Sequence, residues 1–227
     1  IRPFLNRWPD ETLARLDRWV THDNYHVRRL VSEGTRPRLP WAANIRLDPL
    51  VPLRFLDTLH SDPTRYVTRS VANHMNDLSK LAPERVVQTL GAWRRQTQQT
   101  PKELAWMTRH ALRTAVKRGD PGALRLLGYD PDVPIDVSAA VSPAPVRIGD
   151  GFTLDVTLTA QSDVSAMVDY RIVFHRPGGR SGEKVFKLKS VPLQGGERSK
   201  ISKFHKLKSG ASTFTLHAGP HRVVVQV

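Results

Sequence analysis

The spacing of apolar residues changes once along the chain, and this change limits the possible folds more than any other feature of the sequence. In the first part, apolar positions recur every three or four residues, as at Val86 and Leu90, which predicts helices. In the second part they alternate with polar residues, which predicts strands. The change falls at residues 128–134, where two prolines stop the last helix. We therefore predict a multidomain α plus β fold, with a helical domain over residues 1–133 and a β domain over residues 134–227.

The helical part repeats itself with a period near 40 residues. Residues 24–31 align with residues 64–71, and a further shift of 40 reaches Met107 and Ala111. Such a period in paired helices is typical of a HEAT-like α-solenoid, in which each pair buries its apolar face against its neighbours. We predict about three repeats, with an amphipathic helix bundle as the alternative. The same interval relates apolar positions on the preceding helices, at Leu13, Leu53 and Trp93.

The second part contains seven short alternating segments separated by glycine- and proline-rich turns. About ninety residues of this kind are typical of an immunoglobulin-like β-sandwich, here without the cysteine pair of antibody domains. A small barrel remains the alternative. The predicted strands cover residues 135–141, 152–160, 165–175, 183–189, 198–204, 212–217 and 221–227.

The net charge indicates what kind of partner the protein binds. The 227 residues include 35 Lys and Arg against 21 Asp and Glu, which leaves a formal charge of +14 at pH 7. Such an excess favours a polyanionic partner, with nucleic acid ahead of an anionic membrane. A basic protein without such a partner is the alternative.

Several signals are missing from the sequence. The chain has no cysteine, which excludes disulfides and thiolate sites, and its apolar runs are far too short to cross a bilayer. The histidines lack metal-binding spacing, and no dinucleotide or phosphate-loop motif occurs. We expect no metal, no cofactor, no membrane contact, and a monomeric cytoplasmic protein. The chain begins with neither an initiator Met nor a signal-peptide pattern, so we expect it to be part of a longer protein.

The repeat predicts where the charges of the helical part gather. Positions 40 residues apart fall on equivalent faces, and positions four apart stack along one helix. We expect these outward stripes to lie side by side and to follow a phosphate backbone, whereas ordinary solvated helix faces are the alternative. The buried positions are expected at Val27, Leu30, Val31, Val67, Val71, Met107 and Ala111. The stripes comprise Arg29 and Glu33, then Arg69, Asn73 and Asp77, then Arg109, Arg113 and Lys117.

Two acidic residues, Glu33 and Asp77, interrupt these cationic stripes. They could form local ion pairs, Glu33 with Arg29 and Asp77 with Lys80, at the spacing of helix neighbours. The functional alternative is that a carboxylate stabilises positive charge on a deoxyribose, or orients water toward it, as glycosidic cleavage requires.

Two segments resemble a known family. Residues 27–41, which read VRRLVSEGTRPRLPW, and residues 66–80, which read YVTRSVANHMNDLSK, resemble the AlkC branch of the AlkC/AlkD superfamily of bacterial DNA glycosylases. The resemblance implies helical repeats, an appended immunoglobulin-like domain, and excision of cationic N-alkylated bases such as N3-methyladenine and N3-methylcytosine. The partner it implies is double-stranded DNA containing alkylated bases, gripped without a deep base-flipping pocket. Family members carry further helices before the first segment.

The resemblance also implies roles for single residues. Glu33 is the first choice for the catalytic carboxylate and Asp77 the second, with Trp41 as an aromatic wall beside the lesion and Asn73 as a hydrogen-bonding neighbour. The alternative for Trp41 is packing at a repeat junction. Further expected DNA contacts in the helical part are Arg28, Arg29, Arg36, Arg38, Arg69, Lys80, Arg109, Arg113 and Lys117.

The β part has its own basic segment, from Arg180 to Lys208. Here Lys187 and Lys189 alternate with apolar residues and so project from one sheet face. We expect this segment to close on DNA as a clamp, while a lysine-rich edge that blocks aggregation is the alternative. The expected contacts are Lys187, Lys189, Lys203 and Lys206.

Three functions compete at this point. The leading hypothesis is a glycosylase that hydrolyses the N-glycosidic bond of alkylated bases in duplex DNA. The second is a noncatalytic protein that recognises distorted or damaged DNA backbone. The third is a solenoid whose basic face binds an acidic protein.

Overall fold

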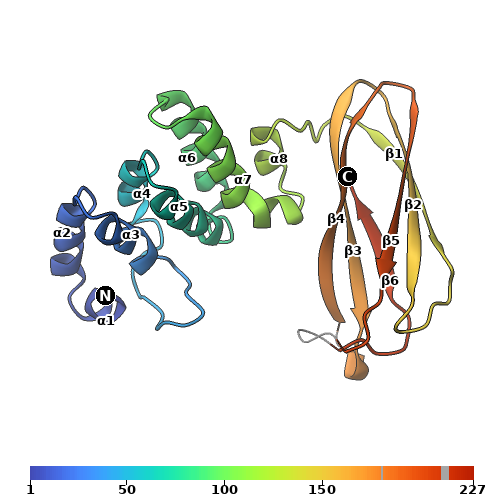
Figure 1. Ribbon diagram of the computed structural model, residues 1–227, viewed down its shortest axis with the longest axis horizontal. Helices are drawn as coiled ribbons and strands as arrows, with labels where there is room; N and C mark the ends of the chain where they lie inside the picture. Colours follow the sequence, from blue (N-terminus) through green and yellow to red (C-terminus); the bar gives the residue numbers. More distant parts are fainter. Residues whose placement is uncertain (180, 211–214) are drawn as a thin grey trace. The chain divides into compact units, whose positions relative to one another are not determined.

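The computed structural model describes residues 1–179, 181–210 and 215–227 (Figure 1). The chain divides into two compact units, residues 1–127 and 128–227. The sequence predicts this boundary after residue 133, six residues later than the structure places it. Both positions lie in the turn-rich segment before the first strand.

Helices form the first unit. Within residues 1–127 they are α1 (Arg2–Arg7), α2 (Pro9–Trp19), α3 (Tyr25–Gly34), α4 (Leu53–Leu59), α5 (Arg65–Leu78), α6 (Pro83–Gln96), α7 (Pro101–Lys117) and α8 (Pro121–Leu126).

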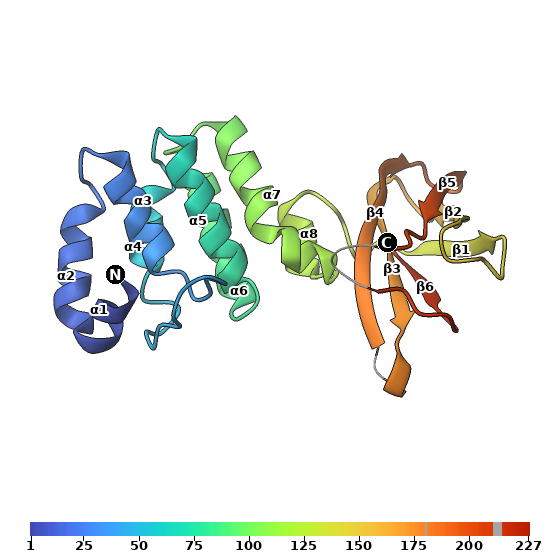
Figure 2. The same ribbon diagram turned by 60° about the horizontal axis from the view of Figure 1, so that its bottom comes forward.

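Three helix pairs, α2/α3, α4/α5 and α6/α7, confirm the predicted solenoid. The second helices of the pairs are α3, α5 and α7. They lie side by side, and all three begin at the same edge of the unit (Figure 2). Local capping sets where they begin, because the Asn24 side chain accepts a hydrogen bond from the His26 amide and the Thr100 side chain accepts one from the Glu103 amide. The repeat therefore places equivalent positions of α3, α5 and α7 on neighbouring helices.

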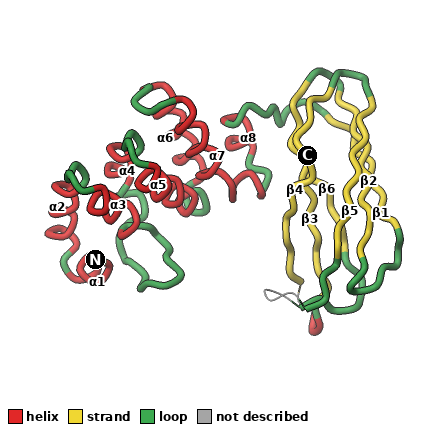
Figure 3. Tube along the Cα trace, in the orientation of Figure 1, coloured by secondary structure: helices red, strands yellow, loops and turns green. Residues whose placement is uncertain are grey.

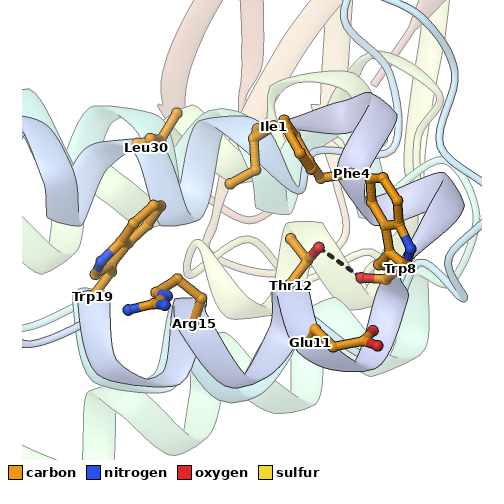
Figure 4. Close-up of a pocket in the computed structure, with 8 residues that line it drawn as sticks. All are labelled: Ile1, Phe4, Trp8, Glu11, Thr12, Arg15, Trp19 and Leu30. Atoms are coloured by element: carbon orange, nitrogen blue, oxygen red, sulfur yellow. Dashed lines mark hydrogen bonds between the residues drawn. The ribbon is translucent and has the colours of Figure 1, made fainter.

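The buried register of these helices follows the prediction except at Val27 and Leu30. Val31, Val67 and Met107 are fully buried, whereas Val27 is only partly buried and Leu30 is 40% exposed. One residue is a turn of about 100° in a helix, so Leu30 and Val31 cannot both face the interior fully. Leu30 instead borders a surface pocket of about 550 Å³ lined by aromatic side chains of α1 and α2 (Figure 4).

The second unit is a sandwich of two three-stranded antiparallel sheets, which confirms the predicted immunoglobulin-like fold (Figure 3). One sheet has the strand order β1-β2-β5 and the other β4-β3-β6. The strands are β1 (Ile135–Ser142), β2 (Gly151–Ala160), β3 (Val164–His175), β4 (Ser181–Leu193), β5 (Arg198–Lys206) and β6 (Arg222–Gln226).

The strand expected at residues 212–217 is not part of either sheet as described. Residues 212–214 lie outside the described part of the chain, and residues 215–217 form a loop. In β2 the alternation of apolar and polar residues predicted the buried face correctly, because Phe152, Leu154 and Val156 all face the core.

The described helices include none that combines the length and apolar character needed to cross a membrane.

Candidate active site and nucleic-acid interface

A buried arginine holds together the two carboxylates that the sequence singled out. Glu33 lies in the last turn of α3, Asp77 lies in the last turn of α5, and Arg36 is the second residue after α3. Arg36 donates from Nη1 to Glu33 Oε1 at 2.7 Å, and from Nε and Nη2 to Asp77 Oδ2 at 2.9 and 2.8 Å. One guanidinium thus fixes two acids from neighbouring repeats.

This arrangement corrects the expectation that Arg36 is a surface contact for phosphate. Arg36 is only 9% exposed, and three of its N–H groups point at carboxylates. Its planar fork suits this bridging role, which a lysine could not reproduce.

Glu33 and Asp77 differ in their access to solvent. The side chain of Glu33 is 19% exposed and that of Asp77 is 6% exposed. Glu33 Oε2 accepts a hydrogen bond from Ser70 Oγ at 2.6 Å and one from Arg29 Nη2 at 3.4 Å. Lys80 Nζ lies 3.4 Å from Asp77 Oδ1. Both local ion pairs considered in the sequence are present, yet Glu33 keeps a surface that a ligand can reach.

His74 supports the residue next to Glu33 and was missed in the sequence. It is completely buried, and its Nδ1 donates to the carbonyl oxygen of Ser32 at 3.1 Å. Burial lowers the pKa of His74 to about 3, so the ring is neutral. Ser70 Oγ also lies 3.0 Å from Ser32 Oγ, so two polar groups of α5 hold the residue next to Glu33. The only sequence signal was its position three residues before Asp77.

Asn73 is oriented by two side chains of α7. Its Oδ1 accepts from His110 Nε2 at 2.9 Å and from Arg113 Nη2 at 3.1 Å. Burial, followed by the charges of Arg113 and Arg69, lowers the pKa of His110, so its ring is neutral at pH 7 with the proton on Nε2. Within the described residues no acceptor is bonded to Asn73 Nδ2. The amide can therefore donate a hydrogen bond to a ligand.

Arg28 is a second correction to the expected DNA contacts. Its Nε donates to Asp62 Oδ2 at 2.6 Å, and Nη1 donates to the carbonyl oxygens of His22 and Asp23. The hydrogen bond to Asp62 raises the pKa of Arg28. The side chain ties α3 to the turn before α5 and is not free for phosphate.

Exposed cations remain at most of the other expected positions. Arg113 is half-buried beside Asn73, and Arg29 lies against Tyr66, so neither is a freely solvated charge. Trp41 is 75% exposed, which excludes the alternative that it packs at a repeat junction. The exposed cations of this set without an ion pair among the described residues are Arg38, Arg69, Arg109 and Lys117, whereas Lys80 is exposed in part and pairs with Asp77.

In the β unit, three of the four expected lysines are exposed. Lys187, Lys189 and Lys206 project into solvent. Lys203 does not, because its Nζ donates to the backbone carbonyl of Lys187 and lies 5.8 Å from the centre of the Tyr170 ring. Alternation alone could not show that Lys203 reaches across to the other sheet.

A further set of residues shares the interval of 40 and was overlooked. His26, Tyr66 and Trp106 each precede a stripe arginine by three residues, so they extend the stripes of α3, α5 and α7 by one turn. No group of three or more His, Asp or Glu side chains suited to a metal ion is found in the described part of the chain.

Comparison with known proteins shows that this combination of helical repeats and an immunoglobulin-like domain is an AlkC-like fold. The structure matches Pseudomonas fluorescens alkylpurine DNA glycosylase AlkC, solved bound to DNA containing an abasic site analog, with a TM-score of 0.87 and 36% identity. That match covers 99% of this chain and 63% of the AlkC chain. The resemblance to AlkC seen in the sequence is thereby confirmed.

Two further comparisons agree. "Uncharacterized protein YhaZ" of Bacillus subtilis (strain 168) is 34% identical over 212 residues, which are 92% of this chain and 58% of YhaZ. Residues 136–227 match the family described as "Uncharacterised protein YhaZ, C-terminal Ig-like domain". The chain thus spans about three fifths of the length of both relatives.

Proposed function

We propose that this protein is a DNA glycosylase that removes alkylated bases from duplex DNA by hydrolysing the N-glycosidic bond. The observation that carries the proposal is the pair Glu33 and Asp77, fixed by Arg36 on the helices that also carry the cationic stripes. The match to an alkylpurine DNA glycosylase over nearly the whole chain supports it.

The substrates we propose are cationic N-alkylated bases, N3-methyladenine and N3-methylcytosine. A positively charged base is already a good leaving group, so its departure needs no strong general acid. A carboxylate that stabilises the oxocarbenium-like sugar and orients water is sufficient. Such chemistry requires no cofactor.

Glu33 is the better candidate for that carboxylate. It is more exposed than Asp77, and Ser70 and Arg36 fix both of its oxygens in place. Asp77 is buried under Arg36 and serves to anchor it.

Neighbouring groups complete the proposed site. The exposed indole of Trp41 can lie against the lesion nucleotide, and Asn73 Nδ2 can donate to it. Exposed cations of the stripes would neutralise phosphates, with Arg69 and Arg109 at equivalent positions of successive repeats. We propose that Lys187, Lys189 and Lys206 add phosphate contacts from the β unit.

Substitution of the two acids tests the assignment in the complete protein. We expect Glu33→Gln to slow single-turnover base release from methylated duplex by about 10²–10³-fold, because a preorganised charge is lost from the transition state. DNA affinity should change less than about threefold, since the substitution keeps the side-chain shape. Asp77→Asn should slow release less than Glu33→Gln does.

The matched control is Asp17→Asn, which neutralises a half-exposed carboxylate paired with Arg54 far along α2. It should release bases at the rate of the unmodified protein. Full activity of Glu33→Gln would exclude Glu33 as the catalytic carboxylate.

The competing function is a noncatalytic protein that binds distorted DNA. The ion pairs of both carboxylates favour it, because each acid also has a structural task. It predicts tight binding to damaged duplex without release of any base, which the same assay detects.

A further inference from the structure

Three aromatic rings form an exposed cluster at the amino ends of α3 and α5. The ring of Tyr66 lies 5.7 Å from that of Tyr25 and 5.3 Å from that of His26, and the latter two are 4.2 Å apart. Tyr25 is 41% exposed and Tyr66 is 44% exposed. Large rings usually bury most of their surface, so a contiguous exposed group is typical of a binding surface.

An arginine connects this aromatic cluster to the candidate active site. The guanidinium of Arg29 lies 4.2 Å from the centre of the Tyr66 ring, and its Nη1 donates to the Tyr66 carbonyl at 2.7 Å. Its Nη2 lies 3.4 Å from Glu33 Oε2. The aromatic cluster therefore lies about two helical turns along α3 from the proposed catalytic carboxylate.

The same type of contact recurs at the next repeat. Trp106, 40 residues after Tyr66, stacks on His110 with ring centres 4.9 Å apart, and the guanidinium of Arg65 lies 3.9 Å from its indole. Glu103 holds Arg65 in place through Arg65 Nε at 2.8 Å. Contacts between rings and guanidiniums thus recur from α3 through α5 to α7. These three helices begin at one edge of the unit (Figure 2).

We propose that the cluster of Tyr25, His26 and Tyr66 stacks the base opposite the lesion after that base has left the duplex. This inference rests on the proposed function and adds a binding site to it. Aromatic side chains stack on any base, and adjacent arginines hold the backbone, which is the usual composition of surfaces for unpaired nucleotides. The formal charge of +14 and the exposed Arg69 one turn further along α5 favour nucleic acid over a protein partner.

Two duplexes test the proposal in the complete protein. One carries a single tetrahydrofuran abasic-site analogue opposite 2-aminopurine, and the other is the same duplex fully paired. We expect Tyr25→Leu and Tyr66→Leu each to bind the abasic duplex about tenfold more weakly, since one stacked base is lost. Affinity for the paired duplex should stay within twofold. The 2-aminopurine fluorescence should be less quenched than with the unmodified protein.

Two variants serve as controls. Tyr66→Phe keeps the ring and should retain affinity and quenching. Phe4→Leu removes an exposed ring from α1, outside the aromatic cluster, and should have no effect. Tyr25 makes ring contacts without touching Arg29, so Tyr25→Leu tests stacking without disturbing Glu33.

Equal weakening on both duplexes would overturn the proposal, because it would indicate a backbone contact or a disturbed fold. Unchanged binding of both leucine variants would overturn it as well. Failure of the proposed function gives a different pattern: no base release from methylated DNA by the unmodified protein, while quenching still depends on Tyr25 and Tyr66.

Discussion

Arg36 is the residue on which the geometry of the candidate active site depends most directly. It is the shared partner of Glu33 and Asp77, and the exposed fraction of its side chain is 11%. In this environment an unpaired carboxylate is much more costly than it would be in water. Stability and the placement of Glu33 are therefore coupled through one side chain.

Substitution of Arg36 should show this coupling. We expect Arg36→Gln to reduce the free energy of unfolding of the helical unit by about 3–5 kcal/mol, because it removes the guanidinium that two partly buried carboxylates share. Denaturant unfolding measures the change. Arg54→Gln breaks a half-exposed pair with Asp17 and should cost less than about 1 kcal/mol. Equal effects of the two substitutions would show that Arg36 is not a buried bridge.

At the scale of elements, the contact between α3 and α5 is the main support of the site. Hydrogen bonds from Ser70 and His74 reach the last turns of α3. The Ser70 bond joins residues 37 positions apart and the His74 bond joins residues 42 positions apart. Both separations are close to the repeat period of 40, so equivalent parts of neighbouring helices are in polar contact.

The buried His74 makes this contact sensitive to pH. Its folded pKa of about 3 lies below the ordinary histidine value of 6.5, so the unfolded chain binds the extra proton first. Its contribution to stability is complete above pH 6.5 and is lost as pH falls toward 3. We expect about 2 kcal/mol of loss from this group between pH 7 and pH 5, at about 1.4 kcal/mol per unit.

Comparison with His74→Gln isolates this contribution, because other groups titrate in both proteins. Unfolding of the helical unit at pH 7 and at pH 5 should show the larger decrease in the unmodified protein. Equal pH dependence of the two proteins would contradict a neutral, buried His74.

At the scale of the whole molecule, the proposed binding of DNA depends on charge. Exposed arginines recur at equivalent positions of successive repeats, as at Arg69 and Arg109, while the β unit adds exposed lysines. Each neutralised phosphate releases counterions, so affinity depends on the number of such contacts and on salt.

Salt titration of DNA binding measures this number. We expect the double substitution Arg69→Gln and Arg109→Gln to reduce the slope of log affinity against log salt by about 1.8, at about 0.9 per contact. The loss should be similar for all DNA sequences. Arg85→Gln, an exposed position on α6, should leave the slope unchanged. A slope unaffected by the double substitution would place the DNA elsewhere.

The sequence by itself determined the two folds and most of the buried register. Helical and strand periodicity are local, and a repeat of 40 residues fixes which helices are equivalent, so both can be read along the chain. Val31, Val67 and Met107 are buried for that reason. The repeat also placed Glu33 and Asp77 on stripes of equivalent helices, but it did not predict that Arg36 would bind both.

Only the tertiary structure decided which charges are free. Arg36 and Arg38 are two residues apart in one loop, yet one is buried between two acids and the other is exposed. That difference depends on Asp77, 41 residues away, which approaches only when α3 packs against α5. Packing of distant helices sets the partner of an arginine, and its partner determines whether it can still bind phosphate.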